Sequence, residues 1–199
     1  MTKRPNAFIN PFERFTEKKL AIAGTLCLLA GAILFRWCRQ TNDGVYHIAP
    51  KPDLTLTGAL TEAICCTVLL TALLWVLGKF INIKTRVIDL ANATLIHRIP
   101  LILGILMIQL PVVKTTTERI LHATRNNTIQ EITSRDLSIA SLTGLLMLGL
   151  LVYSIVLLVN GFRTAVHAKK AVHYIGFAFA LILAEVIYRS FIYPVLSRL

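Results

Sequence analysis

The sequence predicts an all-α membrane protein, a bundle of five transmembrane helices forming a single domain over residues 1–199. Two observations lead to this fold class: five apolar stretches separated by short basic segments, and a composition with 55% hydrophobic residues and a mean hydropathy of +0.67. A soluble domain of this size has too little interior to bury so much apolar surface, whereas about 20 apolar residues suffice for a helix to cross a bilayer.

Four of the stretches are long enough to span a membrane without further argument. They cover residues 19–38, 58–79, 137–160 and 171–195. Arg36 and Trp37 close the first stretch, and Trp75 and Lys79 close the second, as expected at a membrane–water interface. The basic segment before the first stretch resembles the start of a secretory signal, but no small-residue cleavage site follows it, so we expect an uncleaved anchor.

The remaining stretch, residues 84–111, is polar at its start and is predicted to bend near Pro100. Its uninterrupted apolar part, residues 99–110, would rise only about 18 Å as a helix, which is too short to cross alone. Either the helix starts near Lys84 and carries polar residues into the membrane, or the stretch enters and returns without crossing. The distribution of Lys and Arg among the loops favours four crossings over five.

Composition excludes several functional classes. The formal charge is +11, but the basic residues are spread over every loop, which favours contact with anionic membrane lipids over binding of nucleic acid. The four cysteines, Cys27, Cys38, Cys65 and Cys66, lack metal-ligand spacing and are expected to pack as small apolar residues. The sequence contains no catalytic signature, so we expect no enzyme, no metal and no cofactor.

Small residues at intervals of four predict where helices pack closely in lipid. The candidate stripes are Ala23, Cys27 and Gly31 in the first span, and Gly176, Ala180 and Ala184 in the last. Contacts within the chain are favoured, and a homo-oligomer or a membrane-protein partner is the alternative.

Ionisable and polar residues within the spans form a candidate intramembrane site, because each costs free energy unless it is paired or hydrated. The candidates are Asp89, Asn92, His97, Arg98, Glu185 and Arg189. Glu185 and Arg189 stand four residues apart with the acid first, which favours an ion pair over a gate or ion site. His97 would be the titrating member of a functional site.

Pro100 removes a helical hydrogen bond to the carbonyl of Ile96, so the helix should bend beside His97 and Arg98. Transporters build central sites from broken helices of this kind, but proline bends also occur in proteins that transport nothing. Both interpretations stay open.

The segment after the first span contains a turn signal, Asn42-Asp43-Gly44. Asp43 and His47 could bind a metal or act as acid and base, but a simple exposed connector is the favoured interpretation.

Three short motifs give the chain a resemblance to a known family. They are Asn10-Pro11-Phe12 ahead of the first span, Asn42-Asp43-Gly44 with His47 after it, and Val87-Ile88-Asp89-Leu90 with Arg98 and Pro100 in the third. In these the chain resembles bacterial members of the Yip family, small five-span membrane proteins named after Ypt/Rab-interacting proteins. The resemblance implies five crossings, a cytoplasmic amino terminus and a carboxyl terminus on the far side.

Eukaryotic Yip proteins interact with prenylated Rab-type GTPases, but their DLYGP-type motif is missing from this sequence, so that function is not carried across. The expected function is that of a non-enzymatic membrane adaptor or organiser in a bacterial inner membrane. The alternative is a small transporter or channel-like subunit with an internal polar path.

Overall fold

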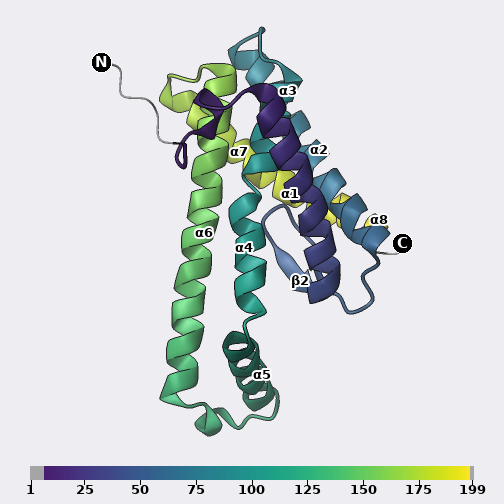
Figure 1. The fold of residues 1–199 in the computed structure, drawn as a ribbon, viewed down its shortest axis with the longest axis vertical. Coiled ribbons are helices and arrows are strands. Elements are labelled where there is room, and N and C mark those ends of the chain that lie inside the picture. The colour runs from purple at the N-terminus through teal and green to yellow at the C-terminus, as the bar shows by residue number, and fades with distance from the viewer. Residues whose placement is uncertain (1–6, 198–199) are drawn as a thin grey trace.

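A computed structural model describes residues 7–197, and these residues are mostly helical (Figure 1). The helices are α1 (Glu17–Cys38), α2 (Leu56–Ile81), α3 (Val87–Ile96), α4 (Ile99–Ile108), α5 (Pro111–Arg125), α6 (Ser134–Val166), α7 (Ala171–Ile187) and α8 (Tyr193–Leu196). A π-helical segment, Tyr188–Ile192, joins α7 to α8, and 3-10 turns cover Pro11–Glu13 and Ile129–Glu131. Two short strands, β1 (Gln40–Asn42) and β2 (Ile48–Pro50), form a hairpin between α1 and α2.

Five helical stretches are long and apolar enough to cross a membrane, which confirms the predicted number of apolar helices. They are Glu17–Cys38, Leu56–Ile81, Val87–Ile108, Ser134–Val166 and Ala171–Leu196. The third includes α3, α4 and the turn between them, so the polar stretch ahead of Pro100 is continuous with the apolar one. The helix that contains the fourth predicted span is longer than expected, starting at Ser134 and ending at Val166.

The helices pack around α3 and α2. α1 contacts α2, α3 and α4, α6 contacts α3 and α4, and α7 packs on α2. In Figure 1 the long α6 runs beside α4 and reaches α5, while α1 and α2 diverge from that pair, and the strand β2 lies between α4 and α1. The segment after the third apolar stretch, expected only to connect two spans, contains the polar helix α5, which packs on α6.

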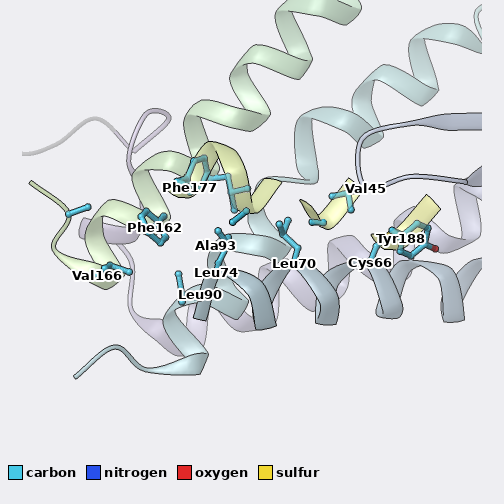
Figure 2. Packing of buried hydrophobic residues seen from close by; sticks show 14 residues of the cluster. Val45, Cys66, Leu70, Leu74, Leu90, Ala93, Phe162, Val166, Phe177 and Tyr188 are labelled. Atoms are coloured by element: carbon cyan, nitrogen blue, oxygen red, sulfur yellow. The ribbon is translucent and has the colours of Figure 1, made fainter. Parts of the chain in front are cut away.

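The main apolar cluster joins α2, α3, α6 and α7 (Figure 2). Leu70, Leu74 and Leu90 have no exposed surface, and the rings of Phe162 and Phe177 lie 5.1 Å apart between their centroids. Tyr188, in the π-helical segment, belongs to the same cluster, as does Val45 of the hairpin.

The helix is interrupted near Pro100, where the sequence predicted a bend. α3 ends at Ile96, α4 begins at Ile99, and Pro100 occupies the first turn of α4, where its missing N–H costs nothing. The hydroxyl of Ser154 on α6 donates to the carbonyl of His97 at 2.6 Å. This hydrogen bond satisfies one of the backbone groups that the break leaves unpaired.

Small residues set the close approaches between helices, although not always those that the spacing predicted. Gly31 is buried against Ile102, but Ala23 is exposed, and Gly24 makes the closest approach of α1 to Leu95 of α3. Cys27 is half-buried.

On α7 the three predicted residues do turn toward neighbouring elements. Gly176 lies against Leu77 of α2, whereas Ala180 and Ala184 are buried in the apolar cluster.

We expect Gly161→Ala to destabilise the fold by about 1–3 kcal/mol, because a methyl group there would overlap Ala93 of α3 and press on the Phe12 ring. Gly144→Ala in the same helix is the matched control, since nothing lies within 4 Å of its position. The midpoint of thermal unfolding, measured for each purified variant in detergent, reports the two stabilities. Equal midpoints for the two variants would contradict the packing of α6 on α3.

Candidate functional site

The hairpin between α1 and α2 is the principal polar feature inside the helical bundle. β1 and β2 pair antiparallel, with Thr41 opposite Ala49 and Asn42 opposite Ile48. Thr41, Asn42 and Val45 are buried, so the expectation of a simple exposed connector is wrong. The chain instead folds back between the helices.

Glu62 on α2 holds the base of the hairpin. Its side chain is 1% exposed, and its Oε2 accepts from the Thr41 hydroxyl at 2.7 Å and from the Asn42 amide at 3.3 Å. The ammonium of Lys51 lies 3.6 Å from Oε1. A buried carboxylate is tolerated only with partners of this kind, so Glu62 and the hairpin stabilise each other.

Glu185 on α7 holds the tip. Its Oε2 accepts from the successive backbone amides of Val45 and Tyr46, at 2.7 and 3.1 Å. The predicted Glu185–Arg189 ion pair is therefore wrong: the carboxylate binds the hairpin, Arg189 is exposed, and no ion pair within 4.0 Å joins the two. The backbone amides of the tip lie close enough to compete successfully for the carboxylate.

Gly44 is required at the turn because a side chain there would overlap the Glu185 carboxylate. Its carbonyl accepts from the thiol of Cys66 on α2 at 3.7 Å. Cys66 lies ten residues into α2, or about 15 Å along the helix, so the tip reaches deep into the bundle.

His97 and Arg98 lie at the α3–α4 break, beside the hairpin tip. The rings of Tyr46 and His97 meet edge to face with centroids 5.8 Å apart. His97 is fully buried and Arg98 is 8% exposed. Neither ring nitrogen of His97 has a hydrogen-bond partner, and neither do Nε and Nη2 of Arg98 or the hydroxyl of Tyr46.

Arg98 lines a small cavity of about 30 Å³. Its other walls come from α1, through Gly31 and Phe35, from Ile102 of α4, and from Tyr46 of the hairpin. Most of this lining is apolar, so the guanidinium is the one charged group that the cavity presents.

Asp89 and Asn92 lie apart from this cavity, near the start of α3. The guanidinium of Arg86 bridges Asp89 at 2.7 Å and Glu17 of α1 at 2.6 Å, and these carboxylates hold the pKa of Arg86 above its ordinary value. The Nδ2 of Asn92 donates to the carbonyl of Glu17 at 3.3 Å. This cluster ties α1 to α3.

The six candidate polar residues therefore do not form one site. His97, Arg98 and Glu185 surround the hairpin tip, Asp89 and Asn92 belong to the Arg86 cluster, and Arg189 belongs to neither. No pattern in the sequence pointed to Thr41 or Tyr46. Glu62 was visible as a lone acid in an apolar helix, and that signal could have pointed to a buried polar partner.

Asp43 and His47 pair with each other at the hairpin turn, with Nδ1 of His47 2.6 Å from a carboxylate oxygen. Within residues 7–197, no three His, Cys, Asp or Glu side chains gather in a way that could hold a metal ion. All four cysteines are free.

No family model, no curated protein and no solved structure matches the chain.

We expect Glu185→Ala to lower the free energy of unfolding by about 2–4 kcal/mol, because it leaves the backbone amides of the buried Val45 and the half-buried Tyr46 without an acceptor. Arg189→Ala, one turn further along and exposed, is the control and should change it by less than about 0.5 kcal/mol. Denaturation in detergent measures both variants. Equal losses would instead indicate that the two residues stabilise the protein as an ion pair.

Proposed function

We propose that this chain is an integral membrane protein of the Yip type that crosses a bacterial inner membrane five times. Its amino terminus lies in the cytoplasm and its carboxyl terminus on the far side. It acts by binding, as a membrane adaptor or organiser, and not as an enzyme.

The observation that carries this proposal is that the acidic side chains inside the apolar helices are used to hold the architecture together. Glu62 and Glu185 hold the hairpin, and Asp89 is tied through Arg86 to α1. Acidic groups that are engaged in this way, with Glu62 buried and Glu185 and Asp89 half-buried, stabilise one arrangement of the helices, which suits a scaffold that presents a constant surface to a partner.

The three motifs behind the family resemblance support the proposal, because each occupies a structurally important place. Phe12 packs at Gly161 of α6 and Asn10 donates to Thr164 at 3.5 Å. The Asn42-Asp43-Gly44 motif forms the hairpin turn, and the third motif covers α3 and its break.

A second candidate function, that of a small transporter, is favoured by one specific observation. His97 and Arg98 are buried near the middle of the third apolar stretch with polar atoms that lack partners. Transporters place such groups at helix breaks. However, the lining of the Arg98 cavity and the lining of the cleft beside Asp89 have no residue in common.

Two measurements on the full-length protein test these functions. With reporters fused to each terminus, we expect the amino-terminal fusion to respond in the cytoplasm and the carboxyl-terminal fusion on the other side. In liposomes containing a pH-sensitive dye, the adaptor function predicts proton flux no faster than in empty liposomes. Faster flux that is lost in both Asp89→Asn and His97→Ala would establish the transporter instead, and two termini on one side would rule out five crossings.

A further inference from the structure

We propose that the cavity between α1, α4 and the hairpin binds a phosphate group, which the Arg98 guanidinium and the Tyr46 hydroxyl recognise. The phosphate could be borne by a lipid headgroup or be a free anion, and the chemistry of recognition is the same for both. The inference deepens the proposed function and depends on it only for the placement of the site within a membrane protein.

The guanidinium of Arg98 is the principal recognition group. It is more than nine-tenths buried and lines the cavity, and its Nε and Nη2 have no hydrogen-bond partner. These two nitrogens lie on the same edge of the planar group, and that edge presents two parallel N–H bonds to two oxygens of one anion. An arginine buried without a counter-ion is costly, so an anion in this place removes a large penalty.

The carboxylates around the hairpin are all engaged with other groups. Glu62 is held by Thr41 and Lys51, Glu185 by the amides of the tip, and Asp43 by His47. Among the residues that the structure describes, none supplies a carboxylate within 4.0 Å of Arg98. The protein therefore leaves the counter-ion of Arg98 to be supplied from outside the chain.

Tyr46 adds a third donor. Its hydroxyl is buried without a partner, and Tyr46 lines the same cavity. Burial raises the pKa of the Tyr46 phenol, so the group stays protonated and can donate. Three donors suit phosphate, because two of its terminal oxygens can accept from the guanidinium edge while a third accepts from the phenol.

The size and the walls of the cavity limit the ligand further. A volume of about 30 Å³ exceeds the 10–15 Å³ or so that one water molecule needs, but it admits only a compact group. Phe35 of α1 and Ile102 of α4 form apolar walls next to the guanidinium. Such walls lower the local dielectric and strengthen the pairing of a guanidinium with an anion, and they also suit the acyl chain of a lipid.

Binding to the purified full-length protein in dodecyl maltoside tests the inference. The probes are inorganic phosphate and dihexanoyl phosphatidic acid, with dihexanoylglycerol as the uncharged comparison, and isothermal titration calorimetry measures each Kd. We expect at least one phosphate probe to bind and dihexanoylglycerol not to bind. Arg98→Gln should weaken binding at least tenfold, and Tyr46→Phe should weaken it about three- to tenfold. Arg36→Gln, at an exposed arginine in the last turn of α1, should leave Kd within about twofold.

The results distinguish the two sources of phosphate, and they also test whether the site binds phosphate at all. Binding of phosphatidic acid alone assigns a lipid headgroup, and binding of inorganic phosphate assigns a free anion. Failure of both phosphate probes to bind the wild-type protein overturns the inference, as does binding that both Arg98→Gln and Tyr46→Phe leave unchanged. If Arg98→Gln does not fold, Tyr46→Phe decides alone, because it removes one hydroxyl and keeps the ring. The binding assay uses no bilayer and does not depend on the number of crossings. A failure of the phosphate site is therefore distinguishable from a failure of the proposed topology.

Discussion

Two carboxylates, the buried Glu62 and the half-buried Glu185, allow irregular backbone to enter a bundle of apolar helices, and the rest of the structure is arranged around that contact. A hairpin has edge amides and carbonyls that a helix would satisfy internally, and within an apolar bundle no water is at hand to satisfy them. Glu62 accepts from the base of the hairpin and Glu185 from its tip. Glu62 would be costly to bury without the hairpin, and the hairpin would be costly to bury without the two acids.

Other features make room for this arrangement. The absence of a side chain at Gly44 lets the Glu185 carboxylate approach the turn, and the break after Ile96 places His97 against the ring of Tyr46. Gly31 lets α1 approach Ile102 of α4, beside the cavity that the hairpin completes. The hairpin and the broken helix thus form one assembly, in which Arg98 is left with unpaired donors.

Hydropathy alone was enough to predict four of the five apolar helices, because the length of an apolar run is a direct consequence of bilayer thickness. For the third, whose apolar part is short, hydropathy left open whether the stretch crosses. Proline chemistry likewise predicted the break near Pro100. Both predictions depend only on residues that are neighbours in the sequence. The start of α5 at Pro111 follows the same rule, although the polar character of that segment suggested only a connection.

The hairpin could not be predicted in this way, because its burial depends on contacts between residues 20 to 140 positions apart. Polar residues such as Thr41 and Asn42 look the same in an exposed loop and in a buried hairpin. The ion-pair expectation failed for the same reason: helical spacing brings Glu185 near Arg189, but it says nothing of backbone amides that arrive from another part of the chain. Spacing also favoured Ala23 where Gly24 makes the contact, since a stripe of small residues does not fix the rotation of a helix.

The most direct test of the re-entrant hairpin is hydrogen exchange at the amides of Val45 and Tyr46 in the purified protein, followed by mass spectrometry of hairpin peptides. Because both amides donate to Glu185 inside the bundle, we expect them to exchange at least about 100-fold more slowly than the same residues in an unstructured peptide. Exchange at the unprotected rate in the folded wild-type protein would show that the tip is exposed to water, and would contradict a hairpin buried between the helices and held by Glu185.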